Sequence, residues 1–438
     1  MKKIFFYLLI MFLYFPLFSQ TGKIQFHEYE LENGLHVILH EDHTIPIVAV
    51  SVMYHVGSKN ENPERTGFAH FFEHLMFEGS KYIKRGEFDK YLQNVGGTNN
   101  ANTNQDRTFY YEILPSNNLE LAFWLESERM LHANVDSIGI ETQRQVVKEE
   151  KRQRVDNQPY GGLMQETFKR AYSVHPYRWP VIGSMDHLNA ASFDDFRDFY
   201  KTFYVPNNAV LSIAGDLNIE ETKAMVEKYF GTIPKGSKVI ATNFMPEPYL
   251  KREVRDTVYD NIQLPAFVEA YRIPAIGTKD FYSAYMLSQL LSGGNSSRLN
   301  KRLIDEEQSA VYVGSFPFPL EDPGIHLVFA VANMGVDAKK IETAIHDEIN
   351  LIKENPISDL EFQKLRNMVE SQFVSDNTSM VSIAENLANY KMFYGNTNLI
   401  NTELSNFLAV TKEDIQKVAA NYFNENNRVV LYYLPKEN

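Results

Sequence analysis

Two histidines and a glutamate lie at a spacing that suits metal chemistry. His70, Glu73 and His74 belong to the apolar stretch 67–77 (GFAHFFEHLMF), which has no Pro and no Gly after its first residue. On a helix, residues four apart share one face with their Cβ atoms about 5–6 Å apart. Two imidazoles can then bind one zinc ion at about 2.0–2.1 Å, and Glu73 borders them as a candidate general base. The alternative is a helix with two hydrogen-bonded histidines and a solvated glutamate.

A catalytic zinc ion has three protein ligands and an open position for water, so a third ligand is needed. The polar segment 138–154 has no Pro, and no Gly after Gly139, and is typical of a helix. It offers Glu141, Glu149 and Glu150. Its residues alone do not choose among them, because a charged run often marks a solvated helix face. The chain has no Cys, so a metal site must use His, Asp and Glu.

Several stretches together resemble the pitrilysin and mitochondrial processing peptidase family, whose His-x-x-Glu-His motif inverts the order found in zincins. The resemblance covers nearly the whole chain after residue 20 and points to the single-site, two-domain bacterial type. The matching stretches are Gly57-Ser58, 65–77, 96–103, 144–150, 175–177 and 206–209.

The resemblance implies roles for residues that spacing leaves open. In that family the third ligand is a Glu six residues after an Arg placed like Arg144, which makes Glu150 the expected ligand here. The family has another Glu seven residues before the ligand, and this chain has Gln143 at that position. Gln143 would therefore be an uncharged residue in the outer shell of the metal, where the family has a charged one. We therefore expect one Zn²⁺ per chain, with Glu73 as its catalytic base.

The segment 98–104 is a candidate for binding substrate. It follows the Gly96-Gly97 turn and has almost no apolar bulk, which is typical of a loop or of an exposed edge strand. An edge strand can pair with an extended peptide through its free N–H and C=O groups. The resemblance favours the strand, with Asn100 and Ala101 at the position that pairs with substrate.

The second half contributes another candidate region. Its Gly-rich stretch 293–299 resembles a family turn from which an Arg and a Tyr approach the scissile bond. Arg298 fits the Arg, whereas Tyr312 falls about one position late. The alternatives are a surface residue at a helix start for Arg298 and a core tyrosine for Tyr312.

The N-terminal residues indicate export. Residues 1–20 place Lys2 and Lys3 before the apolar run 4–15, which is typical of a cleaved secretory signal peptide. No other stretch is apolar and long enough to span a membrane. We expect a soluble periplasmic or extracellular protein with no membrane anchor after cleavage. The net charge of −13 argues against nucleic acid as a partner.

The rest of the chain divides into two similar halves. We expect a zinc-bearing domain at 21–234, a proline-containing linker at 235–250 and a second domain without zinc at 251–438. The stretch 205–211 (VPNNAVL) has an echo at 425–431 (ENNRVVL), which suggests a tandem duplication of one unit. We expect the fold class to be α+β. As the resemblance implies, each domain is a mainly antiparallel sheet packed by helices.

These features together predict a zinc-dependent endopeptidase or oligopeptidase that hydrolyses unstructured peptides by metal-activated water. The resemblance also implies a homodimer, or a heterodimer with a related inactive chain. One alternative is a non-catalytic binding or scaffold subunit that retains the motif as structure, although such a subunit has no use for Glu73. A metal-binding chaperone is a third reading. Chelator-sensitive cleavage of unfolded peptides separates the first reading from the other two.

Overall fold

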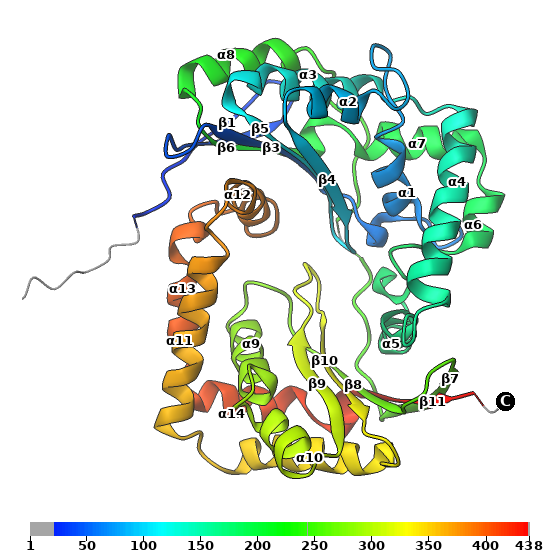
Figure 1. Ribbon diagram of the computed structural model, residues 1–438, viewed down its shortest axis with the longest axis vertical. Helices are drawn as coiled ribbons and strands as arrows, with labels where there is room; N and C mark the ends of the chain where they lie inside the picture. Colours follow the sequence, from blue (N-terminus) through cyan, green and yellow to red (C-terminus); the bar gives the residue numbers. More distant parts are fainter. Residues whose placement is uncertain (1–21, 243, 437–438) are drawn as a thin grey trace, which may run out of the picture.

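The computed structural model describes residues 22–242 and 244–436, and the predicted signal peptide lies outside these ranges. Within them the chain forms two units of sheet and helices, one above the other in Figure 1. The described residues of 235–250 form neither helix nor strand and connect the two units. The domain boundaries at 234 and 251 stay a prediction.

The first unit is built on a six-stranded sheet with the order β1-β2-β6-β3-β5-β4. Its neighbouring strands are antiparallel except β2 and β6, which are parallel. Helices cover one face of this sheet through a continuous apolar core. The strands are β1 (His27–Glu30), β2 (His36–Glu41), β3 (Ile47–Tyr54), β4 (Thr98–Thr103), β5 (Thr108–Pro115) and β6 (Ala209–Gly215). The helices are α1 (Phe68–Leu75), α2 (Phe88–Asn94), α3 (Leu119–His132), α4 (Ser137–Lys151), α5 (Leu163–Ala171), α6 (Met185–Ala190), α7 (Phe193–Phe203) and α8 (Ile219–Phe230).

The second unit repeats this plan. Its sheet has the order β7-β11-β8-β10-β9, which is the order of the first sheet without β1, and again one pair of neighbours is parallel, here the edge strand β7 and β11. This agreement confirms the predicted α+β fold of two tandem, mainly antiparallel domains. The strands are β7 (Val254–Asp260), β8 (Ala266–Arg272), β9 (Ala310–Pro317), β10 (Ile325–Ala332) and β11 (Arg428–Pro435). The helices are α9 (Lys279–Ser292), α10 (Ala338–Glu354), α11 (Asp359–Ser375), α12 (Met380–Tyr394), α13 (Leu399–Leu408) and α14 (Lys412–Tyr422).

The sequence echo marks the same joint in both units. Asn208 Nδ2 donates to the carbonyl of Phe203, where α7 ends, at 2.9 Å, and to the residue that follows β3 at 3.2 Å. Asn427 Nδ2 donates to the carbonyl of Tyr422, where α14 ends, at 2.7 Å, and to the last residue of β8 at 2.8 Å. In each unit one asparagine therefore ties the end of a helix to the end of a central strand.

Each unit also supplies one helix to the sheet of the other (Figure 1). Helix α12 covers the second face of the first sheet, and its Leu387 and Ala388 share a core cluster with Met53 of β3. Helix α5 does the same for the second sheet, where Phe168 shares a cluster with Val268. The two helices hold the same place in the element order. The exchange explains why β3 is an almost uninterrupted apolar run, since both faces of its sheet are covered.

A buried charged cluster joins the units beside these helices. Lys59, whose side chain is 3% exposed, ion-pairs with Asp106 at 2.9 Å within the first unit. From the second unit it meets Glu321 and, at 3.6 Å, Asp322, both in the turn between β9 and β10. His55 Nε2 lies 2.8 Å from Glu321 Oε2. Lys59 is therefore the cation shared by carboxylates from both units.

Candidate metal centre and substrate-binding strand

Helix α1 turns its apolar side to the core and its polar side away from it. The phenylalanines and Leu75 are buried, and the ring of Phe68 stacks on Phe196 with 4.6 Å between centroids. The two histidines and Glu73 are only partly buried on the other side. The apolar packing therefore fixes the direction in which the chemical groups point.

The start of α1 is held by a carboxylate that sequence reasoning missed. Glu61 is 5% exposed and accepts hydrogen bonds from the backbone N–H groups of Gly67 and Ala69, each at 2.8 Å. Burial raises the pKa of Glu61 to about 8, although these N–H donors oppose that effect. Gly67 has φ +95°, and a Cβ there would lie 2.8 Å from the carbonyl oxygen of Ile182. An acidic residue shortly before a glycine at a helix start was the available signal.

Glu150 of α4 meets both histidines of α1. Its Oε2 lies 3.1 Å from His74 Nε2 and 3.4 Å from His70 Nε2. One ligand atom from each of the three residues lies within 4.8 Å of the others. Ligands about 2.0–2.1 Å from a tetrahedral zinc ion lie about 3.3 Å from one another. The separations to Glu150 match that value, so the three residues fit a zinc ion.

The surroundings of Glu150 support the same fit. Oε2 of Glu150 and Nδ1 of His70 are buried and have no hydrogen-bond partner among the described residues. The imidazoles of His70 and then His74 hold the pKa of the Glu150 carboxyl well below its ordinary value. Arg154, in a π-helical turn after α4, contacts the other oxygen, Oε1, at 2.8 Å. That contact leaves Oε2 directed at the two imidazoles.

The two other glutamates considered for the third ligand point elsewhere. Glu141 is 62% exposed in its side chain and accepts hydrogen bonds from Arg144 and Gln145 on its own helix. Glu149 is 48% exposed and pairs with Arg152. The side chain of Glu150 is 15% exposed. The geometry therefore brings together His70, His74 and Glu150, the set expected from the sequence.

Glu150→Gln should weaken zinc binding more than either Glu149→Gln or Glu141→Gln. The amide keeps one oxygen but loses the charge, so we expect a loss in zinc affinity larger than the about 10-fold to 100-fold that replacing an outer-shell partner of a metal ligand costs. Zinc affinity, measured by competition with a chelator on the three purified variants, checks this. If the Glu149 variant lost zinc affinity and the Glu150 variant retained it, the third ligand would be Glu149 and not Glu150.

Glu73 lies beside the histidines with a free carboxylate. No hydrogen bond or ion pair to its side chain is found in the part of the chain that the structure describes. Its charge acts on Arg107, whose pKa is lowered because burial outweighs the raising effect of Glu385 and, more weakly, of Glu73. A partly buried carboxylate without a fixed partner is available to take up a proton.

Gln143 lies two helical turns before Glu150. Its Nε2 donates to Glu78 Oε1 at 2.5 Å, and Glu78 also pairs with Arg85. The described hydrogen bonds of Gln143 include none to His70, His74 or Glu150. Its outer-shell role stays a prediction, and any such role passes through Glu78.

β4 is the edge strand that the sequence left undecided. It pairs only with β5, and its other side is free at the end of the sheet. The N–H of Ala101 bonds to Asn100 Oδ1 of its own strand at 2.9 Å. Ala101 packs against the core under α1, whereas the Asn100 side chain is exposed. The strand therefore offers an edge beside α1, and pairing with a substrate stays a prediction.

Arg298 and Tyr312 lie in the second unit, away from the three candidate ligands. Arg298 forms a two-pronged ion pair with Glu361 at the start of α11, at 2.9 and 3.2 Å. Tyr312 is 48% exposed on β9 and its ring lies 5.7 Å from that of Phe329. Neither has a described hydrogen bond or ion pair to the first unit. The structure does not bring them to the histidine pair within one chain, and their substrate role stays a prediction.

Comparison with known proteins gives the class to which this fold and site belong. The model of the insulinase family (peptidase family M16) matches residues 36–183, and that of the peptidase M16 inactive domain matches residues 190–369. The zinc protease PqqE of Helicobacter pylori is 32% identical over 408 residues, which cover 92% of each chain. The chain therefore belongs to peptidase family M16.

Solved structures agree with this assignment. A crystal structure of a protease from Helicobacter pylori superposes with a TM-score of 0.90 at 31% identity and covers 94% of this chain and 100% of that one. Pitrilysin matches with a TM-score of 0.77 at 20% identity, over 96% of this chain and 46% of its own, which shows the shared fold. The family expected from the motifs is confirmed. Among the described residues, no helix is long and apolar enough to cross a bilayer.

Proposed function

We propose that this protein is a zinc-dependent endopeptidase or oligopeptidase that cleaves unstructured peptides. The observation that carries the proposal is the convergence of His70, His74 and Glu150 beside the unpartnered carboxylate of Glu73. A structural metal site has no need for such a carboxylate. The relative from Helicobacter pylori is named a zinc protease. This name supports a protease rather than an unrelated metal protein.

The three ligands would hold one zinc ion, which supplies Lewis-acid chemistry for the scissile carbonyl and the attacking water. Glu73 accepts a proton from that water on its carboxylate and returns it to the leaving amine nitrogen. Arg154 keeps the Glu150 carboxylate turned toward the histidines. The edge of β4 aligns the peptide backbone beside α1. Each group thus acts from a position that the packing of α1, α4 and β4 fixes.

The zinc-to-protein ratio, measured together with cleavage of an unstructured peptide library, tests the proposal. We expect about one zinc ion per chain, and cleavage that a chelator abolishes and added zinc restores. The second candidate is a non-catalytic binding or scaffold subunit, which the match of residues 190–369 to an inactive-domain model favours. Zinc-loaded protein that cleaves no peptide, alone or with a related chain, would support that candidate instead.

We also propose that the protein is exported and works as a homodimer or with a related inactive chain. The leader-like residues 1–20 support export, and a periplasmic protease, PqqL of Escherichia coli, has a similar fold at 18% identity and a TM-score of 0.76. The present chain covers 47% of PqqL. Dimerisation would bring two such chains to the length of that larger protein. Sedimentation velocity of the purified protein tests the oligomeric state.

Ala101→Pro should impair peptide cleavage without removing zinc. Proline deletes the N–H at the edge of β4 and blocks pairing of the strand with a peptide. We expect kcat/KM to fall about tenfold, in line with the loss of one or two backbone hydrogen bonds of about 1 kcal/mol each. Circular dichroism and zinc content must match the parent. A folded, zinc-loaded variant with unchanged kinetics would exclude the edge strand from substrate binding.

A further inference from the structure

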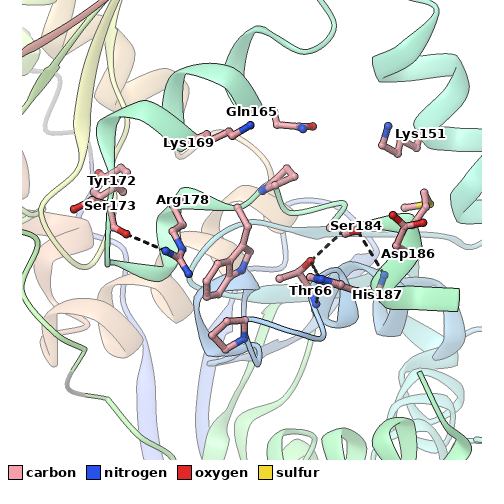
Figure 2. Close-up of a pocket in the computed structure, with 15 residues that line it drawn as sticks. Thr66, Lys151, Gln165, Lys169, Tyr172, Ser173, Arg178, Ser184, Asp186 and His187 are labelled. Atoms are coloured by element: carbon pink, nitrogen blue, oxygen red, sulfur yellow. Dashed lines mark hydrogen bonds between the residues drawn. The ribbon is translucent and has the colours of Figure 1, made fainter. Parts of the chain in front are cut away.

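A groove of about 720 Å³ lies between helix α5, the end of α4 and the segment that leads into α6 (Figure 2). Helix α5 and the end of α4 form one wall, and the segment around Arg178 together with α6 forms the other. The labelled amines of Lys169 and Lys151 extend from the helices toward this space in Figure 2. Its lining residues are Pro63, Thr66, Lys151, Gln165, Lys169, Tyr172, Ser173, Arg178, Trp179, Pro180, Gly183, Ser184, Met185, Asp186 and His187.

The groove adjoins the candidate metal centre on two elements. Thr66 lies four residues before His70, at the start of α1. Lys151, the last residue of α4, directly follows Glu150. The groove is therefore built in part on the residues that precede α1 and on the end of α4, the two helices that carry the candidate ligands.

Two cations of the groove have no carboxylate partner among the described residues. The exposed amine of Lys169 has no described hydrogen bond or ion pair, and Arg178 donates only to the carbonyl of Ser173, at 2.9 Å. Lys151 is neutralised by Asp156 at 2.5 Å, which lies outside the groove. The lining contains one acid, Asp186. The groove therefore carries more positive than negative charge, on a chain whose net charge is −13.

His187 contacts Thr66 in the lining of the groove. Its Nδ1 accepts a hydrogen bond from the backbone N–H of Thr66 at 3.3 Å and lies 2.9 Å from the Thr66 hydroxyl. The Thr66 hydroxyl in turn accepts from the N–H of Ser184 at 3.1 Å. Because His187 is engaged by these contacts, the attraction for an anion is assigned to Lys169 and Arg178.

The rest of the lining suits a peptide rather than a small inorganic ion. Trp179 is fixed by its Nε1–H, which donates to the carbonyl of Ser58 at 2.8 Å, and Arg178 lies 5.6 Å from its ring centre. Pro63, Pro180 and Met185 add further apolar surface. An apolar wall with a few charged groups is typical of a pocket that orients an organic ligand.

We propose that this groove binds a carboxylate of the peptide substrate, so that the enzyme prefers peptides with an acidic group a few residues from the scissile bond. The carboxylate is that of an Asp or Glu side chain or of the peptide C-terminus, and the charge-assisted hydrogen bonds come from Lys169 and Arg178. The inference rests on the proposed peptidase function and adds its substrate class.

The test compares matched fluorogenic peptides that differ only by Glu or Gln, scanned through the four positions on each side of the cleaved bond. Each peptide is made with a free and with an amidated C-terminus, which separates a side-chain carboxylate from a terminal one. We expect the parent to prefer one carboxylate-bearing peptide by about threefold to tenfold in kcat/KM. In the double variant Lys169→Gln, Arg178→Gln this ratio should fall toward one. Lys201→Gln, at an exposed site on α7, should keep it.

Two outcomes overturn the proposal: a parent with no preference for a carboxylate at any position, or a preference that persists in the folded, zinc-loaded double variant. Failure of the peptidase function would show differently, as zinc-loaded parent that cleaves none of the peptides. Fluorescence anisotropy of the same labelled peptides with zinc-loaded Glu73→Gln then tests binding in the groove independently of cleavage. Tighter binding of the carboxylate peptide that depends on Lys169 and Arg178 supports the groove, and equal binding excludes it.

Discussion

Glu73→Gln is expected to retain zinc and to lose peptide cleavage by about 10²-fold to 10⁴-fold in kcat. The amide has the size of the carboxylate but cannot accept a proton from the attacking water. The side chain has no described hydrogen bond or ion pair, so its replacement should leave the fold unchanged. Single-turnover rates on an unstructured peptide, normalised to the zinc content of each preparation, measure the effect.

Glu64→Gln is the matched control, because Glu64 is an exposed carboxylate in the turn before α1. It should retain both zinc and cleavage. Parent-like turnover by zinc-loaded Glu73→Gln would show that Glu73 is not the base. If the parent itself holds zinc and cleaves nothing, then the scaffold function becomes the better account of the motif.

The candidate site was predictable where local spacing determines geometry. His70 and His74 follow from the helical period, since i and i+4 share a face. Spacing did not select Glu150 as the third ligand, and that prediction rested on the family resemblance. The two adjacent valines of α4 did not decide it, since Val146 lies three residues before Glu149 and Val147 three before Glu150. Only the structure shows that Val147 is buried and Val146 exposed. Glu149 is rotated away by about 100° and lies in solvent.

The duplication could be predicted because its echo lies in contiguous residues, where one asparagine closes the same joint in each unit. The exchange of α5 and α12 could not, since amphipathic helices do not indicate which of two similar sheets they will cover. Long-range packing of this kind depends on the linker and on the partner surfaces. The position of Arg298 also had no local signal, because its partner Glu361 is 63 residues away.

The charged cluster at the joint between the units was equally hidden in the sequence. Lys59 stands in a polar turn, where a lysine is normally exposed, yet its side chain is 3% exposed. Burial opposes its charge, but Asp106 and Glu321 more than compensate and raise the pKa of the amine. The Tyr177 hydroxyl donates to Asp106 at 2.6 Å, and the N–H of Glu321 donates to Asp106 at 2.9 Å. The cluster therefore links both units to the residues that precede α1.

Lys59→Met should lower the free energy of unfolding by about 3–5 kcal/mol, because it leaves buried Asp106 beside Glu321 without their shared cation. Urea denaturation followed by tryptophan fluorescence measures this, since Trp179 bonds to the carbonyl of Ser58 next to Lys59. Lys201→Met, at an exposed site, is the control and should stay within about 0.5 kcal/mol of the parent. Equal denaturation midpoints for the parent and Lys59→Met would show that the cluster does not stabilise the joint.

The pH dependence of this effect separates charge from packing. Burial opposes ionisation of Glu321, but His55 and Lys59 lower its pKa from 4.5 to about 2. A carboxylate with a lowered pKa stabilises the folded state fully above about pH 4.5 and loses this contribution as the pH falls toward 2. Part of that shift is absent in Lys59→Met, so the difference in unfolding free energy between parent and variant should narrow over this interval. A difference that stays constant would show that the substitution acts through packing instead of charge.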